Sequence, residues 1–169
     1  SSITEKVPDW ADSPNQKWTG ITGRARVVVY NTDAITDPAT QLPDNLYDFI
    51  DPKWKGKICS RPGSHVYNRA LMASVIAHHG SEKAEKWASG LVNNLARRPQ
   101  GNDRAQVKAI YEGICDVAII NNYYYGKLKF SEDEDQQKWA KALNLTFPNQ
   151  GANGRGAHIN ISGGGVALY

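Results

Sequence analysis

The stretch KICSRPGSHVYNRALMASVIAHHG, residues 57–80, sets out the structural unit on which this chain is built. KIC (57–59) predicts a short strand and SRPGSH (60–65) predicts a loop. VYNRALMASVIAHHG (66–80) predicts a helix that ends at Gly80. The unit is therefore a strand, a loop and a helix in that order.

The same order recurs further along the chain. The apolar run CDVAII, residues 115–120, predicts a second strand, and NNYYYGKL, residues 121–128, predicts a loop that runs into a helix. Strands that alternate with helices indicate an α/β domain with a mostly parallel central sheet flanked by helices.

The remaining segments fit this interpretation. Strands are expected at 24–30, 143–147 and 157–162, and helices at 81–98, 104–113 and 131–143. Ser81 is a plausible N-cap of the first of these helices, and Asn102 or Asp103 of the second. The helix at 81–98 carries apolar side chains at helical spacing, which predict one buried face: Ala84, Trp87, Ala88, Leu91, Val92 and Leu95.

Composition narrows the class of protein. The chain has 169 residues, of which 40% are hydrophobic and 22% charged, as in a globular protein. The net charge is +3, and basic and acidic residues are intermixed, so no nucleic-acid-binding stripe is expected. No apolar run approaches the roughly 18 residues of a membrane span. The chain ends soon after a strand and a glycine turn, and we expect it to be one lobe of something larger.

Tyrosines follow both strands of the repeated unit. Tyr67 lies in the segment after the first strand, and Tyr123, Tyr124 and Tyr125 follow the second. Because ligands of open α/β sheets bind at the carboxyl ends of parallel strands, Tyr67 is expected to meet the tyrosine run. Phenolate oxygens are hard ligands, for which Fe³⁺ is the natural cation. Two helix N-termini at this edge would also suit a small anion, such as carbonate or phosphate.

Packing is the alternative explanation of the tyrosines. Runs of tyrosine usually bury their rings and leave the hydroxyl groups at the rim of the core. Tyr125 is expected to have this role in any case, because successive helical residues point about 100° apart. The histidine pair His78 and His79 is interpreted as a helix end and His158 as structural.

Four segments resemble one protein family, the periplasmic ferric-ion-binding proteins. These proteins are the substrate-binding subunits of iron(III) ABC importers and have the transferrin-like, type 2 periplasmic-binding-protein fold. The resemblance covers nearly all of the chain and rests on the motifs NxYYxxxL, GNDxxQ and WxGxxxRxR. The segments are WTGITGRARVVVYN (18–31), DPKWKGKICSRPGSHVYNRAL (51–71), GLVNNLARRPQGNDRAQVKAIYEGICDVAIINNYYYGKL (90–128) and HINISGGGV (158–166).

The resemblance implies roles for particular residues. Tyr123 and Tyr124 match the paired phenolate ligands of the family, and Tyr67 matches a third tyrosine ligand that one branch uses. Arg26 resembles an arginine of the cleft that lies near the metal or its anion. The resemblance adds further candidates for contact with the anion: Gly63, Ser64, Asn102 and Asn121.

The resemblance also implies a function and a domain organisation. The expected function is binding of Fe³⁺, with carbonate or phosphate as a second ligand, for delivery to the membrane permease of an ABC transporter in the periplasm. The alternative is a protein of the same fold that binds phosphate, a phosphonate or an organic anion without metal; an enzyme is not expected. Residues 1–22 would connect from a first lobe, 23–150 would form the second-lobe domain, and 151–169 would return toward the first lobe.

The cysteines permit one internal disulfide at most. The chain has two of them, Cys59 and Cys115, which lie in or beside the two predicted strands. A disulfide between them would fit a periplasmic setting.

Overall fold

One long strand, β1 (Thr19–Asn31), organises the sheet in the computed structural model, which describes residues 3–15, 17–165 and 167. The strand order is β2-β3-β1-β4, and β5 pairs with the first half of β1. The bounds of the other strands are β2 Ile58–Cys59, β3 Val117–Asn121, β4 Leu143–Thr146 and β5 Ile159–Gly164.

The expectation of a mostly parallel sheet is wrong, because β1 runs against its neighbours. It is antiparallel to β3, β4 and β5, and among the described strands only β2 and β3 form a parallel pair. Since β3 and β4 both oppose β1, they run in the same direction as each other and as β2. The strands that are joined by helices, β2, β3 and β4, are therefore parallel in direction, as expected. The prediction fails because β1 lies between β3 and β4 and runs the opposite way.

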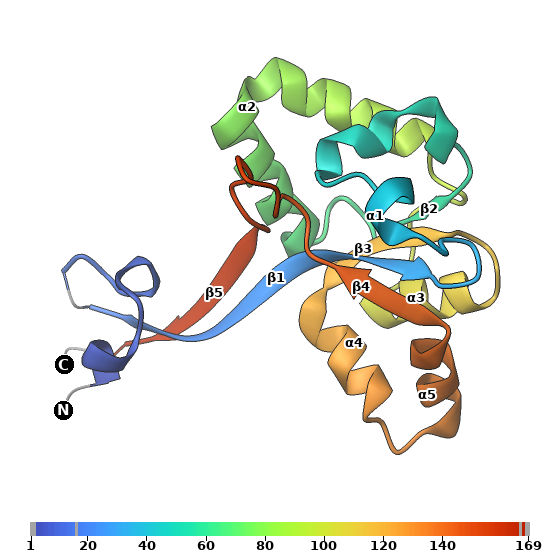
Figure 1. The fold of residues 1–169 in the computed structure, drawn as a ribbon. Coiled ribbons are helices and arrows are strands. Elements are labelled where there is room, and N and C mark those ends of the chain that lie inside the picture. Colours follow the sequence, from blue (N-terminus) through green and yellow to red (C-terminus); the bar gives the residue numbers. More distant parts are fainter. Residues whose placement is uncertain (1–2, 16, 166, 168–169) are drawn as a thin grey trace.

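Helices cover both faces of the sheet (Figure 1). One face carries α2 (Val66–Asn93) together with short helical segments that lie between β1 and β2 in the sequence. The other face carries three helices. The short segments are α1 Pro38–Gln41 and the 3₁₀ helices Leu46–Ile50 and Pro52–Trp54, and the three helices are α3 Asp103–Tyr111, α4 Asn122–Lys129 and α5 Glu134–Lys141. Two more 3₁₀ helices, Ile3–Lys6 and Asp9–Ala11, precede β1.

Alternate side chains of β1 enter two separate cores. Val28 and Tyr30 pack under α2 in a cluster that includes Trp54 and Trp87. Val27 and Val29 point to the opposite face, where they pack with residues of α3, α4 and α5 such as Ile110. This period of two is expected for a strand that is buried on both faces.

α2 contains the two predicted helices, joined at a kink. Gly80 has φ of 79° and ψ of 165°, so the helical conformation is interrupted where the sequence predicted a helix end. Ala84 and Trp87 are buried as predicted, whereas Val92 is 62% exposed, contrary to the prediction. Val92 lies along one wall of an apolar groove rather than in the core.

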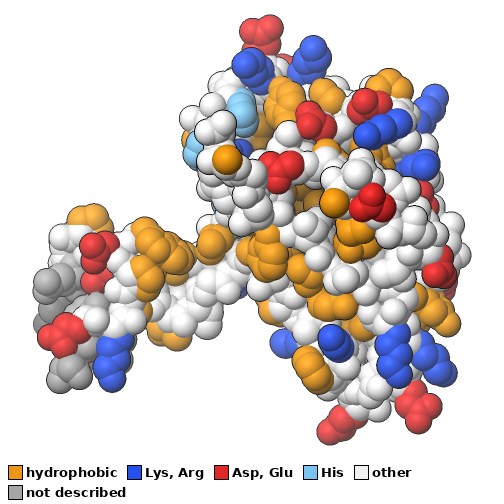
Figure 2. All heavy atoms as spheres, in the orientation of Figure 1, with side chains coloured by type: hydrophobic (Ala, Val, Ile, Leu, Met, Phe, Trp, Pro, Cys, Tyr) orange, Lys and Arg blue, Asp and Glu red, His pale blue; other side chains and the backbone are white. Residues whose placement is uncertain are grey.

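β1 and β5 leave the body together as a two-stranded ribbon, and the 3₁₀ helices that precede β1 lie at its far end (Figure 1). Figure 2 shows apolar side chains along this arm, and the exposed residues there include Trp10, Ile21 and Ile159. β1 begins at Thr19, so the boundary predicted after residue 22 falls inside a strand. No helix in the described part of the chain is long and apolar enough to cross a membrane.

Candidate metal centre

Two parallel strands deliver the tyrosines to one point. α2 begins at Val66, shortly after β2, and α4 begins at Asn122, directly after β3. Tyr67 is therefore the second residue of α2, and Tyr123 is the second residue of α4. Because β2 and β3 are parallel neighbours, the N-termini of both helices lie at the same edge of the sheet.

The hydroxyl groups of Tyr67 and Tyr123 meet at this edge. Their oxygens lie 3.4 Å apart, although 56 positions separate the residues in the sequence. The ring of Tyr124 stacks on that of Tyr123, with centroids 4.4 Å apart and an angle of 28° between the planes. The structure thus brings together the three tyrosines that were predicted as metal ligands.

Tyr125 turns away from the other tyrosines. Its hydroxyl donates a hydrogen bond of 3.2 Å to the carbonyl oxygen of Leu143, and its ring packs against the core under α4. This agrees with the packing role that was expected for Tyr125.

Cations surround the tyrosine pair. The guanidinium of Arg61 lies 4.9 Å from the centre of the Tyr67 ring, and that of Arg24 lies 5.9 Å from it. The ammonium of Lys127 lies 5.4 Å from the centre of the Tyr123 ring. Positive charge at these distances attracts small anions.

Tyr123 holds its proton when no cation replaces it. Desolvation raises the pKa of Tyr123 well above its ordinary value, and hydrogen bonding with Tyr124 and Tyr67 raises it further. A metal ion that binds here as a phenolate complex must therefore displace the proton.

A buried polar network lies directly beneath the tyrosines. Asp103 is fully buried and accepts hydrogen bonds from Arg26 (3.2 Å), Arg61 (2.9 Å) and the backbone N–H of Asn121 (2.8 Å). Arg26 also donates to Asn121 (3.1 Å) and to Asn68 (2.7 Å). Asn68 follows Tyr67 and Asn121 precedes the tyrosine run, so the network links both tyrosine segments.

The residues predicted to contact an anion fall into three groups. Gly63 and Ser64 are exposed in the loop before α2. Asn102 caps α3 by accepting a hydrogen bond of 3.1 Å from the backbone N–H of Ala105. Arg26 and Asn121 have no exposed surface, and the terminal nitrogens of Arg26 bind protein oxygens. Of the predicted anion contacts, Gly63, Ser64 and Asn102 are therefore exposed, and Arg26 and Asn121 are not.

The network under the tyrosines includes Arg61 and Asn68, which the sequence analysis did not name, and Asp103, which it did not predict to be buried. Asp103 was considered only as a helix cap. The sequence gives no direct signal that Asp103 is buried, because GND (101–103) marks only the start of a helix. The fold shows that this start of α3 packs against β3, where Asp103 accepts a hydrogen bond from the N–H of Asn121. No group of three or more His, Cys, Asp and Glu side chains capable of holding a metal occurs among the described residues.

The fold and this site define a class of protein, and sequence comparison agrees. Residues 2–153 match the family model described as bacterial extracellular solute-binding protein. The chain belongs to this family. The protein named "Iron uptake protein A2" of Synechocystis sp. is 46% identical over 164 residues, which are 97% of this chain and 46% of that protein.

Solved structures agree with this assignment. Trichodesmium FutA (IdiA), in complex with iron and citrate ligands, superposes with a TM-score of 0.88 at 45% identity, over 98% of this chain and 51% of that one. Apo ferric ion-binding protein A of Pasteurella haemolytica superposes with a TM-score of 0.85 at 44% identity, over 96% of this chain and 50% of that one. These matches confirm the predicted transferrin-like, type 2 binding-protein fold. The chain spans about half the length of the relatives it matches.

Proposed function

We propose that this chain forms one lobe of a ferric-iron-binding protein and holds Fe³⁺ through the phenolates of Tyr67, Tyr123 and Tyr124. The observation that carries the proposal is the 3.4 Å approach of the Tyr67 and Tyr123 hydroxyl oxygens at two helix N-termini. Oxygen ligands without thiolate or imidazole suit a hard, highly charged cation. The relatives named for iron uptake and ferric-ion binding support the same choice of metal.

A small anion would complete the coordination of iron. The exposed backbone at Gly63 and Ser64 precedes the N-terminus of α2, where N–H groups and the helix dipole favour negative charge. Carbonate, phosphate or a carboxylate such as citrate would fit this position. Citrate accompanies iron in the Trichodesmium structure, which supports an anion in the proposed site.

A second lobe of the same protein would supply the other iron ligands. The matched relatives are about twice as long as this chain, which supports the proposal. We infer that residues 1–22 and 151–169 connect the lobes and that 23–150 form the iron-binding domain described above. Closure of the two lobes would then control capture and release of iron.

The proposed setting is the periplasm, with delivery to the membrane permease of an ABC importer. The family is described as extracellular, and its members named above are binding and uptake proteins rather than enzymes. Binding without catalysis is therefore the proposed activity.

Visible absorption titration with ferric citrate in bicarbonate buffer near neutral pH tests the proposal. We expect a phenolate-to-iron charge-transfer band that saturates at one iron per chain. Replacing both Tyr123→Phe and Tyr124→Phe is expected to abolish the band. Tyr125→Phe is the matched control and is expected to leave the band intact, because its hydroxyl binds Leu143. An unchanged band in the double variant contradicts the assignment.

A further inference from the structure

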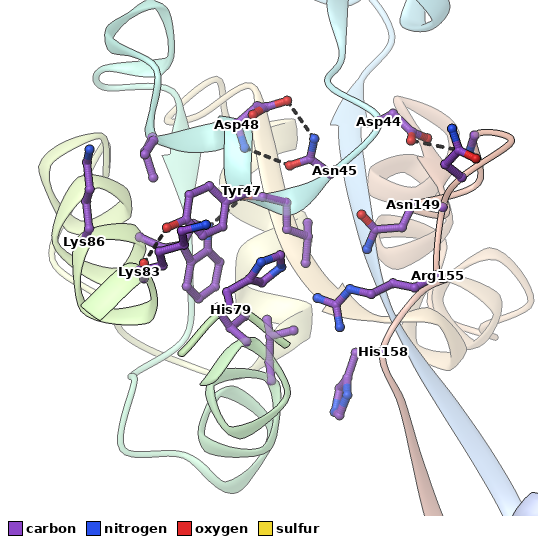
Figure 3. A pocket seen from close by; sticks show the side chains of 18 of the residues that line it. Asp44, Asn45, Tyr47, Asp48, His79, Lys83, Lys86, Asn149, Arg155 and His158 are labelled. Carbon is purple, nitrogen blue, oxygen red and sulfur yellow. Dashed lines mark hydrogen bonds between the residues drawn. The ribbon is translucent and has the colours of Figure 1, made fainter. Parts of the chain in front are cut away.

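A second concave site lies at the kink of α2, apart from the tyrosines. It has a volume of about 760 Å³ and is enclosed by α2, the 3₁₀ helix Leu46–Ile50 and the loop before β5. Figure 3 shows Arg155 extending from this loop toward His79, with His158 beside it. A volume of this size falls within the usual range for small-molecule sites.

The lining of this pocket has more cationic side chains than carboxylates. Arg155, Lys83 and Lys86 line the pocket, and none of them takes part in an ion pair among residues 3–15, 17–165 and 167. Desolvation lowers the pKa of His79, and the charges of Arg155 and Lys83 lower it further. With His79 and His158 neutral, the three cations exceed the two carboxylates of the lining, Asp44 and Asp48, and the pocket carries a net positive charge.

The two carboxylates at the rim, Asp44 and Asp48, accept hydrogen bonds from other residues of the chain. The carboxylate of Asp44 accepts hydrogen bonds from the backbone N–H groups of Gln150 (3.1 Å) and Gly151 (3.3 Å). The carboxylate of Asp48 accepts a hydrogen bond of 2.7 Å from the side chain of Asn45. Both acids hold the shape of the rim, and neither forms an ion pair with Arg155, whose Nη1 donates a long hydrogen bond of 3.5 Å to the hydroxyl of Ser74.

The remaining wall is apolar and fixed in position. The indole N–H of Trp87 donates to the carbonyl oxygen of Leu46 at 2.8 Å. The hydroxyl of Tyr47 donates to the carbonyl oxygen of Lys83 at 2.6 Å, and its ring packs against His79 with centroids 5.4 Å apart. Nε2 of His158 has no hydrogen-bond partner in the described part of the chain.

We propose that this pocket binds a small organic carboxylate with an apolar or aromatic body. The planar guanidinium of Arg155 is the group that recognises a carboxylate, by two parallel hydrogen bonds. Trp87, Leu71 and Val75 line the wall against which the apolar body packs. The site is separate from the proposed iron site, because Tyr67, Tyr123 and Tyr124 do not line it.

Calorimetric titration of the chain with benzoate, benzamide and inorganic phosphate at low ionic strength tests the proposal. Benzamide has the shape of benzoate without its charge, so it is expected to bind at least ~10-fold more weakly, as is phosphate, which has no apolar body. Arg155→Gln is expected to weaken benzoate binding by at least ~10-fold. Arg104→Gln removes an exposed arginine outside the pocket and is expected to bind benzoate as the parent chain does.

Four outcomes would overturn the proposal: absence of benzoate binding, equal binding of benzamide and benzoate, equal binding of benzoate by the parent and Arg155→Gln, or binding of phosphate as tight as that of benzoate. Phosphate that binds as tightly as benzoate would indicate a site for inorganic anions instead. Tyr123→Phe separates this proposal from iron binding. It is expected to lose iron-dependent absorbance and to keep the affinity for benzoate, and loss of both would contradict the independence of the two sites.

Discussion

Consecutive tyrosines at the start of α4 occupy different environments because a helix turns about 100° per residue. Tyr123 meets Tyr67, Tyr124 stacks on Tyr123, and Tyr125 binds the carbonyl oxygen of Leu143. Strand order predicted that Tyr67 meets the tyrosine run, and helical geometry predicted the packing role of Tyr125, whereas the family resemblance singled out Tyr123 and Tyr124 as the pair. The same reasoning did not reach Asp103 or Asn68, whose roles depend on the packing of α3 and α2 against β1 and β3.

The raised pKa of Tyr123 makes iron binding dependent on pH. Its phenol is neutral in the iron-free chain from acid to mildly basic pH, so binding Fe³⁺ as a phenolate releases a proton. Iron affinity is therefore expected to fall as the pH falls. In an unbuffered titration, Tyr123→Phe is expected to release about one proton fewer per iron than the parent chain. Equal proton release by the two proteins would show that Tyr123 does not bind the metal.

Asp103 neutralises two buried arginines, and its charge is expected to be necessary for stability. Desolvation lowers the pKa of Arg26, and Asp103 opposes this effect. Asp103→Asn leaves Arg26 buried without a charged partner, which is expected to reduce the free energy of unfolding by about 3–5 kcal/mol in urea denaturation. Glu112→Gln breaks the exposed pair Lys108–Glu112 and is expected to change the free energy of unfolding by less than about 1 kcal/mol. Similar losses in both variants would contradict this account.

At the scale of elements, local signals predicted helices and strands better than they predicted the sheet. Gly80 interrupts α2 where a helix end was expected, and Asn102 caps α3. The reversed direction of β1 was not predicted, because local pattern records that a strand is buried on both faces and not which way its neighbours run. The exposure of Val92 has a similar cause, since helical spacing does not show where a buried face ends.

Two helical glycines are expected to respond in opposite directions to alanine. A Cβ atom at Gly90 would lie 2.7 Å from Cβ of Ile50, so Gly90→Ala forces α2 away from the 3₁₀ helix Leu46–Ile50. We expect a loss of about 1–3 kcal/mol in the free energy of unfolding. A Cβ atom at Gly126 meets open space, so Gly126→Ala is expected to gain about 0.5–1 kcal/mol through helix propensity. Urea denaturation measures both, and changes of the same sign would contradict the packing argument.

At the scale of the whole molecule, the candidate iron site is assembled from segments that only the tertiary structure brings together. Tyr67 and Tyr123 follow different strands, and the Arg26–Asp103 pair links β1 with α3 beneath them. Cys59 and Cys115 add a covalent link between the same regions, with Cα atoms 5.9 Å apart in a disulfide. Cys59 ends β2 and Cys115 precedes β3, so the bond fixes the two strands that lead to the tyrosines.

The disulfide is expected to contribute strongly to global stability. It closes a loop with a sequence separation of 56 residues, for which chain entropy predicts about 4 kcal/mol. The variant with Cys59→Ala and Cys115→Ala is therefore expected to unfold about 8–16 °C below the parent chain. Calorimetry without iron measures this difference, and Cys115→Ala alone is expected to lose about the same amount, because one substitution already removes the bond. Cys59 and Cys115 are both buried, so a mild reductant has little access to the bond between them. A double variant that melts within about 2 °C of the parent would show that the Arg26–Asp103 network and the two cores hold β2 against β3 without the covalent link.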